Sequence, residues 1–262
     1  MVTRNKVSVP DAAAFAESLA DAAAPIALRY FRTPLAVATK VDMSPVTEAD
    51  QEIEACIRRR IRERFPEHGL LGEEHGREPG SSDLTWVIDP IDGTKSFITG
   101  MPTFGTLIAL LEGETPVLGI IDHPVLRERW VGVSSAPSRY NGQPCRTRGC
   151  TRLSDAALYA TTPDMFEGPA RVAFERVSAS ARLRRFGGDC YAYALLASGF
   201  VDAVIEAQLK PYDYMALIPV IEGAGGVMTD WSGKRLGLES DGRVIAAATA
   251  SLHREILDRL NT

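Results

Sequence analysis

Two amphipathic helices are predicted at the start of the chain, because apolar residues recur there at helical spacing. The first helix, over 11–31, has this pattern at Phe15, Leu19, Ala22 and Ile26. Pro25 should kink this helix or split off its last turn. The second helix has the pattern at Ile53, Ile57 and Ile61 and should end at Pro66.

The second helix has a recognisable N-terminus. Thr47 is suited to cap it, and Asp50 stands at its third position, which is a variant of the capping box. From this spacing alone, Asp50 is explained equally well by capping and by a further function. Residues 58–60, three consecutive arginines, are expected on solvated helix surface or else at a subunit contact. The preceding segment, 33–42, should be extended and includes Lys40.

Short apolar runs predict a meander of mostly antiparallel strands over 69–147, backed by the two helices. Strands are expected at 69–72, 86–88, 106–111, 117–121 and 129–133. Asn141-Gly142 is a strong signal for a tight hairpin turn. Residues 76–83, which are rich in Gly, Ser and Pro, are expected to form a loop.

Strands and helices alternate from residue 156 onward, which predicts a mixed-sheet α/β layer with helices on both faces. Strands are expected at 158–161, 183–186, 201–207, 225–229 and 244–248. Helices are expected at 166–181, 190–198, 213–223 and 252–260. We therefore expect a layered α+β and α/β chain, an αβαβα sandwich, with halves 1–148 and 149–262. The two halves should share a large interface, with the site in the cleft between them.

Composition excludes several classes of protein. The chain has 262 residues, 45% of them hydrophobic, with a formal net charge of −5 and no block of Lys or Arg, so a nucleic-acid-binding surface is not expected. No apolar run approaches the length of a membrane span, and the polar first ten residues do not resemble a secretory signal. None of the four cysteines has C-x-x-C spacing, so we expect reduced thiols in a cytoplasmic protein.

The chemistry is expected to centre on Asp89-Pro90-Ile91-Asp92-Gly93-Thr94, which ends the apolar run 86–88. Hard divalent cations such as Mg²⁺ take oxygen ligands, usually carboxylates together with a substrate phosphate. Glycine lets the backbone approach a ligand closely, and a helix that begins at Gly93-Thr94 would point its N–H groups at an anion. This stretch therefore predicts a metal site fused to a phosphate site.

Other acids stand at the ends of predicted elements. Each of them alone is more often a helix cap or a surface acid, and His75 is more often a surface residue than a ligand. Several acids in one cleft would repel one another strongly unless cations lay among them. On this argument we predict one metal cluster, formed by Glu73, Asp89, Asp92 and Asp213.

Three motifs in register resemble those of one family along nearly the whole chain. Residues 86–94 resemble the signature of the inositol monophosphatase family of Mg²⁺-dependent, lithium-sensitive phosphatases. Gly72-Glu73-Glu74 is similar to the upstream acidic motif of that family. Tyr212-Asp213, opening a helix that ends at Gly225-Gly226, is similar to its C-terminal motif.

The resemblance implies roles for individual residues. Glu73, Asp89, Asp92, Asp213 and the carbonyl of Ile91 would bind two or three Mg²⁺ ions, with Asp89 bridging two of them. Thr94, oriented by Asp50, would position the attacking water together with Glu73. The amides of Gly93 and Thr94 would hold the phosphate, and Lys40 would lie near the metals. Hydrolysis is expected to proceed without a phosphoenzyme.

Some stretches depart from inositol monophosphatases proper. Lys95-Ser96-Phe97 stands where those enzymes typically have Thr-Asn-Phe. Four stretches resemble the histidinol-phosphate phosphatase branch more closely, namely 94–100, 119–124, 189–193 and 209–213. Histidinol phosphate has an ammonium group and an imidazole, so its pocket should offer carboxylates that metals do not use. Asp189 and Glu206 are the spare acids, and Lys95 is a further candidate for substrate binding.

We therefore predict a Mg²⁺-dependent phosphomonoesterase that hydrolyses L-histidinol phosphate in histidine biosynthesis. Within the same chemistry, the alternatives are inositol 1-phosphate, fructose 1,6-bisphosphate and a 3′-phosphoadenosine nucleotide, since family membership does not fix the leaving group. A catalytically silent metal- and phosphate-binding scaffold is an alternative of another class. The expected partners are a small phosphorylated substrate and a second copy of the chain, without nucleic acid or membrane.

Overall fold

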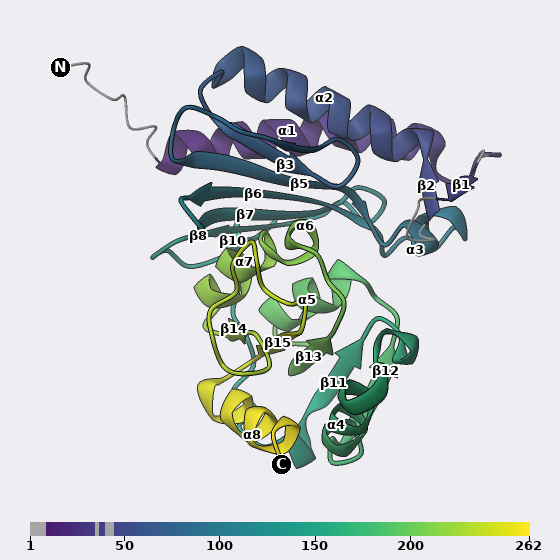
Figure 1. Cartoon of the computed structure of the whole chain (residues 1–262), viewed down its shortest axis with the longest axis vertical. Coiled ribbons are helices and arrows are strands. Elements are labelled where there is room, and N and C mark those ends of the chain that lie inside the picture. Colours follow the sequence, from purple (N-terminus) through teal and green to yellow (C-terminus); the bar gives the residue numbers. More distant parts are fainter. Residues whose placement is uncertain (1–8, 35–36, 40–44) are drawn as a thin grey trace.

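Figure 1 shows the computed structural model of the chain, which describes residues 9–34, 37–39 and 45–262. Layers of helix and sheet alternate, so the predicted αβαβα sandwich is confirmed. Lys40 lies outside the described residues. Among those that are described, no helix combines the length and apolar character needed to cross a membrane.

The first layer consists of α1 (Val9–Tyr30) and α2 (Glu48–Arg64). Helix α1 runs through Pro25 to Tyr30, so of the two predicted effects of Pro25 the separation of the last turn is wrong. Helix α2 begins after Thr47, and its Ile53, Ile57 and Ile61 are fully buried against the first sheet, as their spacing predicted.

The three consecutive arginines of α2, at 58–60, are not all solvated as predicted. Arg59 and Arg60 are exposed, whereas Arg58 is buried and pairs with Glu54 one turn earlier. The prediction failed at Arg58 because a buried acid on the same helix face neutralises its charge.

The first sheet follows the predicted meander. Its strands are β3 (Gly69–Gly72), β4 (Gly76–Glu78), β5 (Leu84–Asp92), β6 (Gly105–Glu112), β7 (Thr115–His123), β8 (Glu128–Val133), β9 (Arg139–Tyr140) and β10 (Gln143–Pro144). The spatial order is β10-β9-β8-β7-β6-β5-β3-β4, and only the β3–β5 pair is parallel among these described strands. Strand β4 occupies part of the predicted loop 76–83, because it pairs back onto β3. A separate ribbon pairs β1 (Val37–Thr39) with β2 (Pro45–Thr47).

Strand β5 is buried on both faces. Trp86 and Ile88 belong to the hydrophobic cluster under α1 and α2, and Val87 belongs to the cluster around the middle helices. This division follows from the alternation of side chains along a strand. It explains why the strand reads as a continuous apolar run before its acids.

The second sheet has the order β12-β11-β13-β15-β14 and is mixed, as predicted. Its strands are β11 (Ala157–Ala160), β12 (Leu183–Phe186), β13 (Ala203–Glu206), β14 (Val227–Thr229) and β15 (Val244–Ala247). Strand β11 pairs in parallel with both β12 and β13, and β15 runs antiparallel to β13 and β14. The outer layer consists of α4 (Gly168–Ser178) and α8 (Ala250–Leu260), with 3-10 turns at η1 (Leu153–Asp155) and η2 (Pro163–Met165).

The middle layer contains α5 (Cys190–Ala197), α6 (Pro211–Tyr214) and α7 (Leu217–Gly223), which lie between the two sheets in Figure 1. Its hydrophobic cluster takes side chains from both sheets. The predicted helix 213–223 begins earlier, at Pro211, and is interrupted after Tyr214. The short helix α3 (Thr94–Ile98) follows β5. The boundary at 148/149 falls between β10 and β11 and stays a prediction.

Candidate functional site

Strand β5 brings two acids to the same side by an irregularity in its pairing. Asp89 pairs with Leu107 and Asp92 with Gly105, so β5 has one residue more than β6 over this interval. The extra length coincides with Pro90, which has no N–H to give to a ladder. In a regular strand, residues three apart point to opposite faces. The bulge removes that alternation, so both carboxylates can face the same site.

A third acid reaches these two from the other half of the chain. Asp213 is the third residue of α6, and its carboxylate accepts a 2.6 Å hydrogen bond from the backbone N–H of Lys210. One carboxylate oxygen from each of Asp89, Asp92 and Asp213 lies within 4.8 Å of the other two. We call these three residues the acidic triad.

The acidic triad is electrostatically unfavourable without a cation. Burial, followed by the charges of Glu73, Asp92 and Asp213, raises the pKa of Asp89 well above its ordinary value. Burial is also the main cause that raises the pKa of Asp92, and it raises the pKa of Asp213 to about 7. Carboxylate oxygens that repel one another in a buried site form the donor set that Mg²⁺ prefers, so these residues fit that ion.

Glu73 lies beside the acidic triad. Strands β3 and β5 are parallel with Gly72 opposite Ile88, and the N–H of Glu73 donates to the Ile88 carbonyl at 3.3 Å. The carboxyl ends of neighbouring parallel strands meet at the same edge, which brings Glu73 next to Asp89. Glu73 is not a member of the acidic triad, but its charge raises the pKa of both Asp89 and Asp213.

The turn after Asp89 is held by its own polar groups. The Ile91 N–H donates to Asp89 at 3.1 Å, and the Thr94 hydroxyl donates to the Ile91 carbonyl at 3.2 Å. Gly93 has a φ of 81° and precedes α3. A Cβ at Gly93 would lie 2.7 Å from the carboxyl carbon of Asp189. Glycine is therefore needed here for backbone conformation and for close approach.

Asp50 caps α2, and its predicted contact with Thr94 is not formed in the described structure. One oxygen of Asp50 accepts both the backbone N–H of Thr47 at 2.9 Å and its hydroxyl at 2.6 Å. The other oxygen is buried and has no hydrogen-bond partner within residues 9–34, 37–39 and 45–262. Burial, opposed by the Thr47 bonds and supported by the charge of Glu73, raises the pKa of Asp50.

A cavity of about 190 Å³ opens beside the acidic triad and brings together most of the other predicted site residues. Two triad members line it, Asp92 and Asp213. The predicted residues outside the triad that line it are Gly93, Thr94, Lys95, Asp189 and Glu206. It also has lining residues that sequence reasoning did not select, among them Thr161, Met165, Tyr193 and Leu209. His75, by contrast, is an exposed residue on the β3–β4 turn, as expected for a surface histidine.

Asp189 is held in place from two sides. It precedes α5 with a φ of 47°, and Ser96 of α3 donates a 2.5 Å hydrogen bond to it. Burial raises the pKa of Asp189, and the Ser96 bond and the charge of Lys95 oppose that shift. The Lys95 side chain is exposed at the rim of the cavity.

Glu206 forms the buried end of the cavity. Its two oxygens accept 2.8 Å hydrogen bonds from the Thr161 N–H and from the Tyr193 hydroxyl. Burial raises the pKa of Glu206, and both hydrogen bonds oppose this shift. Thr161 could have been found from the sequence, because β11 and β13 are parallel and their carboxyl ends meet at one edge.

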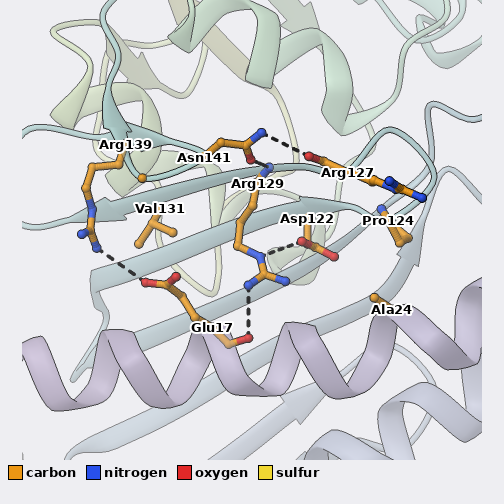
Figure 2. Close-up of a pocket in the computed structure, with 10 residues that line it drawn as sticks. Glu17, Ala24, Asp122, Pro124, Arg127, Arg129, Val131, Arg139 and Asn141 are labelled. Carbon is orange, nitrogen blue, oxygen red and sulfur yellow. Dashed lines mark hydrogen bonds and ion pairs between the residues drawn. The ribbon is translucent and has the colours of Figure 1, made fainter.

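A second cavity, of about 370 Å³, lies between α1 and strands β7 to β9 (Figure 2). Arg129 donates to Asp122 at 2.7 Å and to the Glu17 carbonyl at 3.4 Å, and Arg139 lies 3.5 Å from the Glu17 carboxylate. These charged groups pair with one another across the gap, as Figure 2 shows, and attach α1 to the sheet. The second cavity is therefore structural in character, unlike the one beside the acidic triad.

Comparisons with known proteins agree with this geometry. The sequence profile of the inositol monophosphatase family matches residues 10–262. The bifunctional phosphatase IMPL2, chloroplastic, of Arabidopsis thaliana is 49% identical over 257 residues, covering 95% of this chain and 74% of that protein. A histidinol-phosphatase of Chlorobaculum parvum is 36% identical over 230 residues, covering 87% and 89%. The solved structure of an inositol monophosphatase from Zymomonas mobilis superposes with a TM-score of 0.90 and 43% identity, covering 98% of this chain and all of that one.

Proposed function

The chain belongs to the inositol monophosphatase family, and from this premise we propose that it hydrolyses L-histidinol phosphate to L-histidinol and phosphate in a Mg²⁺-dependent reaction. A phosphoric monoester hydrolase follows from the family. The substrate is the proposal, and one observation carries it. Two carboxylates outside the acidic triad line the cavity that adjoins it, namely the half-buried Asp189 and the buried Glu206.

The proposed metal ligands are the acidic triad, Glu73 and the carbonyl of Ile91. A bound Mg²⁺ would supply a water of lowered pKa and neutralise phosphate charge. The chain contributes the closely spaced carboxylates, which the β5 bulge and α6 bring within 4.8 Å of one another. We propose that two or three Mg²⁺ ions bind at each site.

The remaining polar groups orient the reactants. We assign the backbone amides of Gly93 and Thr94, at the start of α3, to the phosphate, because the first N–H groups of a helix lack acceptors within it. The Thr94 hydroxyl and Glu73 would position the attacking water. Asp50 has one buried oxygen without a partner in the described structure, so it could accept the Thr94 hydroxyl after rotation about the Thr94 side chain. No side chain is assigned as a nucleophile, and a covalent phosphate trapped during turnover would contradict that assignment.

The leaving-group end of the cavity suits a cationic alcohol. An ammonium or imidazolium group would donate a charge-assisted hydrogen bond to Asp189, whose position Ser96 fixes. Glu206 adds a second negative group at the buried end. Relatives named as histidinol-phosphatases support the same substrate.

Inositol 1-phosphate is the second candidate, and the geometry of Glu206 favours it. Both Glu206 oxygens already accept hydrogen bonds from Thr161 and Tyr193, an arrangement suited to a neutral polyol. Fructose 1,6-bisphosphate and 3′-phosphoadenosine nucleotides stay open as further substrates of the same chemistry. A homodimer in the cytoplasm also remains a prediction, and light scattering on the purified protein tests the dimer.

Phosphate release in the presence of Mg²⁺ tests the substrate directly. The panel contains histidinol phosphate, inositol 1-phosphate, fructose 1,6-bisphosphate and 3′-phosphoadenosine 5′-phosphate. We expect the highest kcat/KM for histidinol phosphate. A higher kcat/KM for another compound of the panel would overturn the proposed substrate and leave the phosphatase chemistry in place. Absence of Mg²⁺-dependent phosphate release from all four compounds would favour a catalytically silent scaffold.

A further inference from the structure

Glu54 is a fully buried acid that has no part in the proposed chemistry. It lies on α2, one turn after Asp50, and its side chain has no solvent exposure. A buried carboxylate is costly unless hydrogen bonds or a counter-charge stabilise it. The partners of Glu54 therefore show what this position stabilises.

Two of these partners belong to the turn that carries Glu73. The Glu54 carboxylate accepts the backbone N–H of Glu74 at 2.7 Å and that of His75 at 3.2 Å. Residues 73–75 connect β3 to β4, and both N–H groups follow Glu73 directly in the chain. Glu54 thus holds the backbone on the C-terminal side of Glu73.

On the other side of Glu73, Gly72 lies directly against the same carboxylate. A Cβ at Gly72 would lie 2.0 Å from a Glu54 oxygen, a distance that no side chain can occupy. Glycine at this position is required by close approach. Glu73 is therefore flanked on both sides by residues that contact Glu54.

Arg58 completes the arrangement from the next turn of α2. Its Nε donates to Glu54 at 2.7 Å, and its guanidinium also hydrogen-bonds the Gly76 carbonyl. The Arg58 side chain is only 4% exposed, so the ion pair is shielded from solvent. The pair thereby contacts the turn through N–H groups at 74 and 75 and through a carbonyl at 76.

We propose that Glu54, paired with Arg58, is a positioning residue that fixes Glu73 beside the acidic triad for metal binding, an inference that rests on the proposed function. Glu73 repels Asp89 and Asp213 when no cation is present, so a free turn would move it away from them. The Glu54–Arg58 pair opposes that movement through the backbone. Groups that orient metal ligands in this way contribute strongly to metal affinity.

Mg²⁺ titration of the purified chain by calorimetry, without substrate, tests this role. Glu54→Gln keeps the shape of the side chain but replaces one acceptor oxygen by a donor, so it cannot serve all three N–H groups. We expect Mg²⁺ affinity to fall roughly ten-fold. Glu52→Gln is the matched control, because Glu52 lies on the same helix and pairs with Arg29 and Tyr30 away from the turn.

Hydrolysis of an aryl phosphate at increasing Mg²⁺ separates positioning from general damage. The Mg²⁺ concentration for half-maximal rate should rise with Glu54→Gln, while kcat at saturating Mg²⁺ returns close to that of the parent. Should Glu54→Gln fail to fold, Arg58→Lys carries the test, since it keeps the charge but loses the reach to Gly76. A several-fold weaker Mg²⁺ affinity is then expected.

Different results of these experiments overturn the positioning role of Glu54 and the proposed metal-dependent function. Parent-like Mg²⁺ affinity in Glu54→Gln, or in Arg58→Lys if that variant is used, overturns the positioning role and leaves the proposed function intact. A parent chain that binds no Mg²⁺ overturns the metal-dependent function, and the positioning role with it. A kcat that stays low at saturating Mg²⁺ also counts against positioning, because it indicates a general structural defect.

Discussion

Ser96 donates a 2.5 Å hydrogen bond to Asp189, a residue 93 positions later in the chain. Ser96 lies on α3, which follows the strand that carries two triad acids, and Asp189 precedes α5 in the middle layer. The bond therefore joins the proposed phosphate end of the cavity to its proposed leaving-group end. Ser96 also belongs to the stretch that departs from inositol monophosphatases proper.

Asp189→Asn should impair histidinol phosphate selectively. Loss of the negative charge removes the proposed partner of the cationic leaving group, so KM for histidinol phosphate should rise roughly ten-fold or more. An aryl phosphate has no such group, and its kcat/KM should change little. Steady-state kinetics on both substrates measures the difference, with exposed Asp164→Asn as the control. Equal losses of kcat/KM on the two substrates would show that Asp189 does not recognise the leaving group.

Ser96→Ala should have the same selectivity with a smaller effect. The Asp189 charge is retained, but its carboxylate loses the hydrogen bond that fixes its position, which is worth about 1 to 2 kcal/mol. We expect KM for histidinol phosphate to rise several-fold with kcat on the aryl phosphate preserved. A lower kcat on the aryl phosphate with an unchanged KM for histidinol phosphate would contradict this role of Ser96.

Asp213→Asn should separate stability from metal binding. Removing one of three mutually repelling carboxylates should raise the melting temperature of the chain in EDTA, because the acidic triad destabilises the fold when no cation is bound. The same variant should lose most of the stabilisation by Mg²⁺, and its kcat/KM should fall by about a hundred-fold or more. Thermal melts in EDTA and in Mg²⁺ provide the comparison. A lower melting temperature in EDTA would show that the Lys210 contact outweighs the repulsion.

Arg129→Met should destabilise the fold by about 3 kcal/mol, because it leaves Asp122 buried without its counter-charge. Arg139→Met, which removes a pair that is nearly half exposed, should cost less than about 1 kcal/mol. Urea unfolding of the two variants tests the difference. Adding Asp122→Asn to Arg129→Met should recover part of the loss, and an unchanged or lower stability would argue against an uncompensated charge.

His123 should make the fold sensitive to acid. It is fully buried, its Nδ1 lies 2.8 Å from the Phe104 carbonyl, and burial lowers its pKa to about 4. An unfolded chain takes up this proton below a pH of about 6.5, whereas the folded chain does not until about 4. The unfolding free energy should therefore fall between pH 7 and pH 5, by about 2 kcal/mol from this group.

His123→Gln should remove that part of the pH dependence. Urea unfolding at pH 7 and pH 5, compared with the parent and with His75→Gln on the exposed turn, isolates the contribution. The groups around His123 include Cys190, 3.9 Å from its Nε2, and Glu128, whose charge partly opposes the shift. An equal pH dependence in all three proteins would exclude His123 as the cause.

Local sequence patterns predicted the elements that local interactions determine. The Thr47–Asp50 capping box, the buried face of α2 and the Asn141-Gly142 turn need only neighbours in the chain. The cluster of Asp89, Asp92 and Asp213 needed more, since Asp213 is brought in by the fold. Its position at the start of a predicted helix and the resemblance to a family motif both pointed to it, but not its distance from the other two acids.

The errors arose where distant contacts decide the outcome. Arg58 looked solvated because helical periodicity does not reveal that Glu54 and the β3–β4 turn enclose it. Strand β4 looked like a loop because only pairing with β3 makes it a strand.

The junction of Asp189 and Cys190 constrains how this site could change during evolution. Asp189 lines the cavity, and the N–H of Cys190, the next residue, donates a 2.6 Å bond to Asp92 of the acidic triad. Any backbone shift at 189 would therefore also disturb Asp92, which is a proposed metal ligand. We therefore expect related enzymes to change substrate at this position by exchanging side chains while the backbone keeps its conformation. Loop insertions should occur elsewhere around the cavity.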